Sequence, residues 1–334
     1  GEESLRLTIS LPINLVSFSR KFATVSSRAG RTLNYYIWGT MNFIIWLEED
    51  KNGGIREADY QNVSAMLKYQ VDYGNKHFDP ADLTTIWEDE SGVAAWVLAQ
   101  PTYRAYDIQV RHDLRGGAFE REVLEFADAR IVEVMRANGV ESDVIVGDAF
   151  RCDLARITLI TEMGWKRDDD PPYIINRARI ADTPEPEIPD GYTIRPVAGV
   201  EEAAAVAAVH QAAFPGASWT AELYRQVMES PVYDPARELV AETADGSFAA
   251  FVVTWYDELN RTGLMEAVGT HVDHRQIGLG RAIVRFAAHH MAAAGGMEYA
   301  TVANSESNAA SSALYRSVGF KLWQVIDGYV KPIS

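Results

Sequence analysis

The sequence predicts an α/β protein that contains two mixed α/β domains in tandem. Its 334 residues are enough for two domains at about 100 to 200 residues each. Residues 182–191 contain three prolines and four acidic residues and show no periodic apolar face, which predicts a stiff, extended linker. Beyond this linker, short strands alternate with amphipathic helices, a pattern typical of a mixed sheet covered by helices.

The elements after the linker follow from local patterns. Apolar residues at three- and four-residue spacing predict a helix over 200–214, and Asp245-Gly246 predicts a hairpin turn between two strands. Gly295-Gly296 ends a long helix, and Gly319 closes a shorter one. The expected strands are 192–196, 238–242, 248–256, 263–272, 299–303 and 321–330, and the expected helices are 200–214, 221–228, 278–294 and 308–317. The order is strand, two helices, three strands, helix, strand, helix, strand.

Composition and charge exclude several classes of protein. A content of 47% hydrophobic and 23% charged residues is that of a globular chain. The formal net charge of −16 opposes binding to nucleic acid or to an anionic membrane. The single cysteine, Cys152, fits a reducing compartment, and the apolar tract 35–47 is too short for a spanning helix and is better explained by buried strands. We therefore expect a cytoplasmic protein with no nucleic-acid or membrane partner.

The linker divides the chain into its expected parts. We expect an N-terminal extension of uncertain role over 1–53, a first domain over 54–182, the linker over 183–191 and a second domain over 192–334. From Asp190 onward there are 16 acidic and 10 basic residues, so this half carries −6 and the first half −10. Neither domain is a basic module.

One segment of the second domain has the composition of an anion-binding turn. Arg275-Gln276-Ile277-Gly278-Leu279-Gly280-Arg281 lies between an expected strand and an expected helix. Glycines allow the backbone to approach a phosphate closely, and the free N–H groups of the first helical turn point toward it. A pyrophosphate would suit such a site, although glycines at this position can also serve only to make the turn.

Three motifs in the second domain occur together in order and spacing. Glu266-Ala267-Val268-Gly269-Thr270-His271 precedes the glycine loop, and Asn308-x-x-Ser311-x-x-Leu314-Tyr315-x-x-x-Gly319-Phe320 follows it. With the Arg-x-x-Gly-x-Gly loop between them, the region closely resembles the GNAT superfamily of N-acetyltransferases over about residues 190 to 334. Val272 stands where many relatives carry proline. The two-domain layout is similar to the mycothiol synthase branch of that superfamily, in which one unit is active and the other is not.

The resemblance implies roles for two side chains. Glu266 corresponds to the carboxylate that removes a proton from the amine, and Tyr315 to the tyrosine that can protonate the leaving thiolate. The non-catalytic interpretations are that Glu266 is a solvated glutamate on a strand and that Tyr315 is a packed aromatic side chain on a helix. The base could instead be Asp257, Glu258 or His271.

The resemblance also implies that acetyl-CoA is the cofactor. The loop would bind its pyrophosphate, the strand backbone at Thr270 to Val272 would pair with its pantetheine amides, and Asn308 would cap its helix and contact the pantetheine arm. No metal is expected, since His289-His290 has no acidic or sulfur partner at ligand spacing. The expected cofactor-binding residues are Thr270, His271, Val272, Arg275, Gln276, Ile277, Gly278, Leu279, Gly280, Arg281 and Asn308.

The first domain resembles a degenerate copy of the second. Ile55 to Asp59 resembles the start of the second domain, and Arg111 to Gly116 falls where His271 to Gln276 falls. A helix over 119–137, a strand over 143–146 and a helix ending near Gly164 follow. Its chemistry is lost, because every functional position is changed. Ala118, Glu120, Ile160, Asp153 and Tyr106 take the places of Gly278, Gly280, Tyr315, Asn308 and Glu266, respectively.

The expected function is transfer of acetyl from acetyl-CoA to an amine of a small molecule, by direct attack through a tetrahedral intermediate. The excess of acidic over basic residues in the chain favours a cationic acceptor. The alternative is a non-catalytic acyl-CoA sensor or assembly protein that kept the fold. The acceptor's identity is left open, as is the oligomeric state, a homo-oligomer included.

Overall fold

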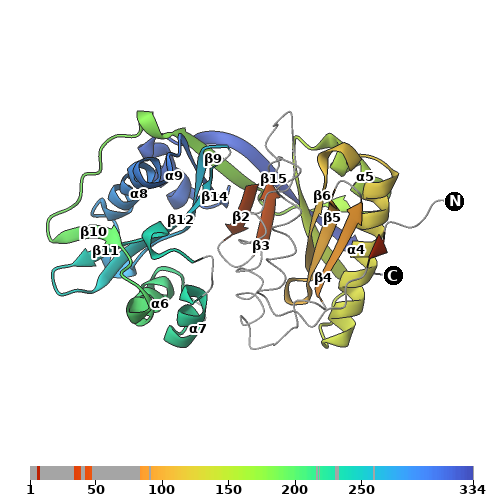
Figure 1. Cartoon of the computed structure of the whole chain (residues 1–334), viewed down its shortest axis with the longest axis horizontal. Coiled ribbons are helices and arrows are strands. Elements are labelled where there is room, and N and C mark those ends of the chain that lie inside the picture. Colours follow the sequence, from red (N-terminus) through yellow and green to blue (C-terminus); the bar gives the residue numbers. More distant parts are fainter. Residues whose placement is uncertain are drawn as a thin grey trace. The chain divides into compact units, whose positions relative to one another are not determined.

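The computed structural model describes residues 6–7, 34–38, 42–46, 83–89, 92–215, 217, 219–229, 233–258 and 260–333. The expected resemblance at residues 55–59 and most of the extension over 1–53 lie outside these ranges. The chain divides into two compact units (Figure 1). Unit 1 comprises Gly1–Tyr35, Phe43–Pro172 and Val325–Ser334, and unit 2 comprises Tyr36–Asn42 and Tyr173–Gln324.

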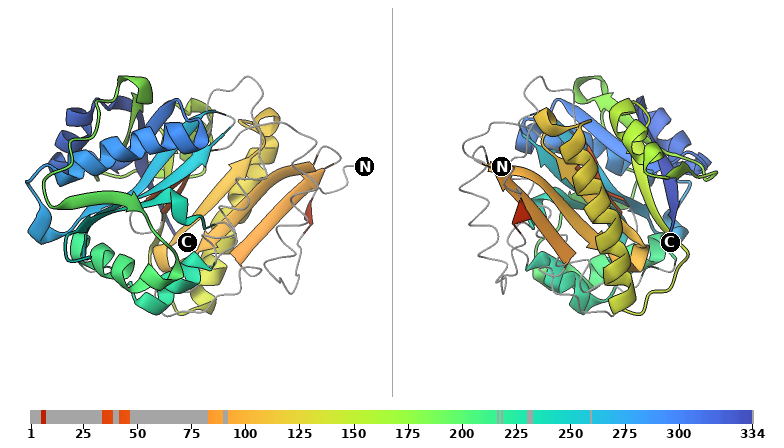
Figure 2. Two further views of the ribbon diagram at one scale, coloured as in Figure 1. Left: turned by 60° about the vertical axis from the view of Figure 1, so that its left-hand side comes forward. Right: turned by 90° about the vertical axis from the view of Figure 1, so that its right-hand side faces the viewer.

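Unit 1 contains an antiparallel sheet with strand order β1-β4-β5-β6. Apolar side chains of helix α4, among them Val123 and Ala127, pack on this sheet around Trp87, and Figure 2 shows α4 lying along the strands. The described elements are β1 (Arg6–Leu7), β4 (Thr84–Asp89), β5 (Gly92–Gln100), β6 (Ala105–Val110), α4 (Ala118–Ala137), β7 (Val144–Phe150), α5 (Leu154–Glu162) and β8 (Lys166–Arg167). Strands β2 (Asn34–Trp38) and β3 (Asn42–Trp46) form a separate two-stranded sheet, which agrees with the strands expected in the apolar tract.

From β10 to β15 the chain has the element order predicted from the sequence, and unit 2 begins with one further strand, β9. The elements are β9 (Tyr173–Arg179), β10 (Tyr192–Pro196), α6 (Ala203–Ala213), α7 (Ala221–Met228), β11 (Glu238–Thr243), β12 (Phe248–Asp257), β13 (Thr262–Thr270), α8 (Leu279–Gly295), β14 (Tyr299–Ser305), α9 (Ala309–Val318) and β15 (Lys321–Pro332). Short 3₁₀ turns precede α6 and α8. The mixed α/β architecture expected from the alternation of strands and helices is confirmed.

The sheet of unit 2 carries helices on both faces. Its strand order is β10-β11-β12-β13-β14-β9, and every neighbouring pair is antiparallel except β13 and β14. One core forms where α8 and α9 cover the sheet, with Ile283 and Val252 fully buried. A second core lies under α6 and α7, around Val206 and Phe251. Strand β12 therefore lies between two well-packed layers.

In each unit, a strand that follows the other unit's last helix pairs with a strand of that unit. Strand β9 comes directly after unit 1's α5 and β8, yet it pairs with β14 of unit 2 along its whole length. Residues 326–332 of β15 come after unit 2's α9 and pair with β7 of unit 1. The linker at residues 183–191 suggests a division of the chain into two halves. Relative to that division, each compact unit contains the final strand of the other half.

One predicted element ends early. The strand expected over 263–272 stops at Thr270, and Val272 lies in the 3₁₀ turn Val272–His274 with 56% of its surface exposed. The turn begins because the His271 side chain accepts a hydrogen bond from the Asp273 N–H. His271 and Val272 therefore lie outside the strand that was expected to contain them, and their contact with the cofactor stays a prediction. No helix in the described part of the chain is long and apolar enough to cross a membrane.

Candidate functional site

The loop before α8 has the backbone of an anion-binding turn. Gln276 and Gly278 have φ angles of 64° and 91°, and Gly278 is the N-cap of α8. No side chain caps this helix and its first turn carries no acidic residue, so its N–H groups are available to an external anion. A Cβ on Gly280 would lie 3.3 Å from the Thr270 hydroxyl, so any side chain there would require the Thr270 side chain to shift.

Polar side chains of the loop hold it in place. The Nε and Nη2 atoms of Arg275 donate to the carbonyls of Thr270 and Ala213, at 3.0 and 2.9 Å. His274 Nδ1 lies 2.7 Å from the Tyr192 hydroxyl. Arg275 therefore connects the loop to β13 and α6. In an anion site it would hold the loop in place, because its guanidinium already donates to these two carbonyls.

The remaining predicted loop residues differ in exposure. Leu279 is 1% exposed and belongs to the core, so only its backbone faces the loop. Ile277 is 47% exposed. Arg281 is exposed and its Nε lies 3.3 Å from the Ser317 hydroxyl of α9. Asn308 caps α9 as predicted, because its Oδ1 accepts from the Ser311 N–H at 3.1 Å.

The parallel strands beside this loop separate. β13 and β14 pair only where Thr262–Leu264 oppose Tyr299–Thr301, although β13 continues to Thr270. From Met265 onward, this side of β13 has no paired strand in the described chain. The open edge offers backbone groups to an extended ligand, in the manner of an added strand.

Glu266 lies at a β-bulge on this open strand. Val252 of β12 opposes Val268, but Thr254 opposes Met265, so β13 carries one extra residue at Glu266-Ala267. The indole N–H of Trp255 donates to the Glu266 carbonyl at 2.8 Å. Sequence analysis missed Trp255, because the hairpin pattern gives its strand but not the register that places it against the bulge.

The Glu266 carboxyl group is buried without a hydrogen-bond partner. The residue is 8% exposed, and neither carboxyl oxygen has a partner among the described residues. Burial raises its pKa well above the usual value for a glutamate. A buried, unpartnered titratable group at a strand opening is typical of a functional site rather than of a structural one.

Tyr315 lies close enough to Glu266 to feel its charge. The tyrosine is 5% exposed, and burial, with the nearby Glu266 carboxylate as the second cause, raises the pKa of its hydroxyl. The phenol therefore keeps its proton at neutral pH. The structure brings together the two catalytic candidates, one from β13 and one from α9.

The alternative bases have other surroundings. Both carboxylate oxygens of Asp257 accept hydrogen bonds from Asn260, and Glu258 is exposed. His271 caps the 3₁₀ turn. Within the described residues there is no group of three or more His, Cys, Asp or Glu side chains placed to hold a metal ion.

A comparison with known protein families shows which family the region around this site resembles. Residues 204–320 match the family described as "Acetyltransferase (GNAT) family". This stretch is a GNAT domain. The GNAT domain contains the bulge, the glycine loop and Tyr315, so the predicted resemblance is confirmed for the region that carries the motifs.

Curated relatives of the GNAT domain are mycothiol acetyltransferases. The one from Thermobispora bispora is 30% identical over 151 residues, which is 42% of this chain and 50% of that protein. The one from Streptomyces griseus is 30% identical over 148 residues, 43% of this chain and 48% of that protein. The chain thus spans about half the length of the curated relatives it matches.

Solved structures share the fold over more of the chain. A GCN5-related N-acetyltransferase from Sphaerobacter thermophilus has a TM-score of 0.58 at 16% identity and covers 80% of this chain and 85% of its own. A tandem GNAT protein from the clavulanic acid biosynthesis pathway has a TM-score of 0.57 at 14% identity, over 82% of this chain and 95% of its own. At these identities the likeness shows the fold alone, and it agrees with the expected tandem layout.

Proposed function

We propose that the chain is an acetyl-CoA-dependent N-acetyltransferase whose GNAT domain acetylates an amine of a small molecule. The observation that carries the proposal is the buried Glu266 carboxyl group, unpartnered among the described residues and next to Tyr315 at the opening between β13 and β14. The GNAT domain and the mycothiol acetyltransferase relatives support this class of reaction.

The chain's own groups fit acetyl-CoA. Uncapped N–H groups at the start of α8 suit a pyrophosphate, and the absence of acidic residues from that turn removes electrostatic repulsion. The open edge of β13 up to Thr270 suits the amides of pantetheine. Acetyl-CoA would supply the activated acetyl group as a thioester.

The proposed reaction uses one base and one acid. A neutral amine attacks the thioester carbonyl directly, so a C–N bond forms and the C–S bond breaks. Glu266 in its carboxylate form takes the proton that the amine loses, and Tyr315 gives its proton to the departing thiolate. The raised pKa of the Tyr315 hydroxyl keeps that proton available at neutral pH.

The surroundings of Glu266 favour a cationic acceptor. An ammonium group that reaches the buried carboxylate finds a partner of opposite charge. Because a low-dielectric site disfavours both charges, the site favours the neutral amine, whose ammonium proton passes to solvent before Glu266, as carboxylate, takes the second proton during attack. The amines we propose are therefore those that are protonated in solution.

The test combines binding with turnover. Glu266→Gln and Tyr315→Phe should each lower kcat by about 10² to 10⁴ while acetyl-CoA affinity, measured by calorimetry, changes less than threefold. Glu306→Gln, an exposed site in the same domain, is the control and should behave as the parent. Full turnover in both active-site variants would remove the assignment of base and acid. Cofactor binding without turnover of any amine would instead favour the acyl-CoA sensor.

A further inference from the structure

The bulge of β13 releases one side chain from the alternation of the strand. One residue of β12 opposes both Glu266 and Ala267. On either side of these two, Met265 and Val268 pack into the core formed with α8 and α9, whereas Ala267 packs against the core under α6 and α7. Glu266 is therefore the extra residue, and its carboxyl group lies near Tyr315 of α9.

An indole N–H holds this bulge. Trp255 of β12 lies opposite Leu264 in the ladder, and its Nε1 donates to the Glu266 carbonyl at 2.8 Å. A bulge interrupts the backbone hydrogen bonds between two strands, so a side-chain donor at this point replaces one that regular pairing would supply. A slip of β13 by one residue into regular pairing would turn Glu266 toward a face of the sheet.

Unit 1 contains an equivalent pair of strands, β5 and β6. The Arg111 N–H donates to the Ala94 carbonyl at 2.8 Å, and the His271 N–H of unit 2 donates to the Ala249 carbonyl at the same distance. Arg111 follows β6 directly, as His271 follows β13. These two hydrogen bonds therefore mark corresponding positions in the two pairs of strands.

The pair of strands in unit 1 is regular. All residues of β6 pair with β5 without a register shift. Gln100 stands six residues after Ala94, as Trp255 does after the corresponding alanine of unit 2, and the Gln100 amide donates to the Asp107 side chain. Tyr106 stands where unit 2 has its carboxyl group. The bulge, the indole and the carboxyl group thus occur together in unit 2, and the described strands β5 and β6 lack all three.

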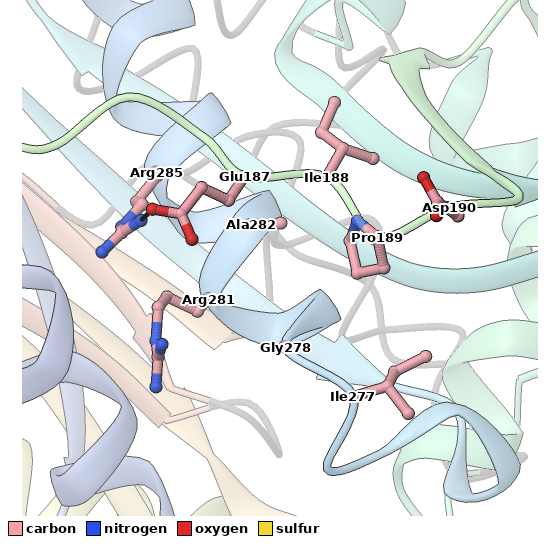
Figure 3. Close-up of a pocket in the computed structure, with 9 residues that line it drawn as sticks. All are labelled: Glu187, Ile188, Pro189, Asp190, Ile277, Gly278, Arg281, Ala282 and Arg285. Atoms are coloured by element: carbon pink, nitrogen blue, oxygen red, sulfur yellow. Dashed lines mark hydrogen bonds and ion pairs between the residues drawn. The ribbon is translucent and has the colours of Figure 1, made fainter.

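A pocket beside the start of α8 lies apart from this bulge. Its volume is about 430 Å³, and Figure 3 shows the linker on one side of it and the first turns of α8 on the other. Its lining includes Glu187, Ile188 and Asp190 of the linker and Arg281 and Arg285 of α8, but not Glu266. Glu187, with a side chain that is 87% exposed, is therefore a carboxylate of unit 2 that is separate from the buried one.

We propose that Trp255 is a positioning residue whose indole N–H holds the bulge of β13 and so keeps the Glu266 carboxyl group at the opening between β13 and β14. This inference rests on the proposed function, since it assigns a further residue to the reaction in which Glu266 is the base. Trp255 acts through the backbone of Glu266 and not on the substrate. Its loss therefore affects the chemical step, while the loop before α8 keeps its own contacts.

The first readout separates kcat from KM. Trp255→Phe keeps an aromatic ring and removes the N–H, so kcat should fall at least about tenfold while KM for acetyl-CoA stays within about twofold. Trp165→Phe is the matched control, because it removes an indole N–H that donates to Asp128 of unit 1 at 3.3 Å, and it should keep the kcat of the parent. Incorporation of 3-benzothienylalanine at position 255 replaces only the N–H by sulfur, and it should lower kcat as Trp255→Phe does even where the smaller ring disturbs folding.

The second readout needs no turnover. Infrared spectroscopy identifies the carboxyl band of Glu266 as the band that Glu266→Gln lacks, and the titration midpoint of this band gives the pKa, which burial raises in the parent. Tyr315 faces Glu266 from α9 and stays neutral during the titration, because its own pKa is raised. Trp255→Phe should lower the midpoint by about one pH unit or more, since the carboxyl group gains access to water. Trp165→Phe and Glu187→Gln should leave the midpoint unchanged.

The outcomes separate this inference from the proposed function. A parent-like kcat and midpoint in the two chains altered at position 255 would overturn the inference, and so would a lower kcat with an unmoved midpoint. An equal fall of kcat in Trp165→Phe would also overturn it, because the loss would then follow from reduced stability. A midpoint that depends on Trp255 in a chain that acetylates no amine would keep the inference and reject the proposed function.

Discussion

The starts of helix α4 in unit 1 and helix α8 in unit 2 have similar backbone geometry. A carboxylate of the protein occupies the first of them but not the second. Both follow a 3₁₀ turn and a residue with positive φ, Gly116 in one and Gln276 in the other. In unit 1 the Glu120 carboxylate accepts hydrogen bonds from the Gly116 N–H and from Arg156, and it is fully buried. In unit 2 Gly280 stands at that position, and no carboxylate lies in the first turn.

The difference shows how a helix start that could bind an external anion is closed by a side chain of the same domain. A helix start attracts negative charge whether it comes from a ligand or from the protein's own chain. In unit 1 a glutamate supplies that charge permanently, and Ile160 and Asp153 stand where the sequence comparison places Tyr315 and Asn308 of unit 2. The Glu120–Arg156 ion pair thus takes the electrostatic place that a bound anion would have at this helix start.

The largest effect is expected where this internal pair is broken. Glu120→Ala leaves the Arg156 guanidinium, 13% exposed, without its carboxylate and leaves the Gly116 N–H without its acceptor. We expect the free energy of unfolding to fall by about 3 to 5 kcal/mol in urea titrations. Glu122→Ala, an exposed neighbour, should cost well under 1 kcal/mol.

The same variant tests whether unit 1 retains a latent site. Calorimetry with acetyl-CoA should still give one site per chain, because Tyr315 and Asn308 have no equivalents in unit 1. A stoichiometry of two would show that Glu120 alone separates the copies.

The reciprocal substitution should destroy the proposed cofactor site of unit 2. Gly280→Glu places a side chain within 3.3 Å of the Thr270 hydroxyl and a negative charge at the proposed pyrophosphate position. Acetyl-CoA affinity should fall at least hundredfold, or about 3 kcal/mol. Ala293→Glu, exposed near the other end of α8, should bind acetyl-CoA as the parent does. Retained affinity in Gly280→Glu would show that the loop does not bind the cofactor.

A third, smaller effect is a pH dependence of the stability of the chain that arises from Glu266 in unit 2. Burial raises the folded-state pKa of Glu266 above its unfolded value, so the folded chain binds the proton more tightly. Stability should therefore fall as pH rises between these two pKa values, by about 1.4 kcal/mol per pH unit. Glu266→Gln removes this slope, and its melting temperature should exceed that of the parent at pH 7 but not at pH 4. Identical pH profiles of the two proteins would mean that the carboxyl group is not buried in solution.

The helices and strands of unit 2 could be predicted because each has a local signal. Ala221–Met228 forms a helix with the predicted bounds, and Asn308 caps α9 as expected. The bulge at Glu266 could not be predicted, because it depends on the register between β12 and β13. The position of Ile188 could not be predicted either, since a proline-rich segment reveals its stiffness but not the surface on which it lies.

The exchange of final strands has a consequence for synthesis. Strand β7 finds its partner only when residues 326–332 have been made, 176 residues after Phe150. At about 5 to 20 residues per second, the ribosome needs about 10 to 35 s to reach them. During that interval β7 lacks the partner it has in the finished fold, a state in which an unpaired edge can join another chain. Unit 1 thus begins to fold first and finishes after the GNAT domain has emerged.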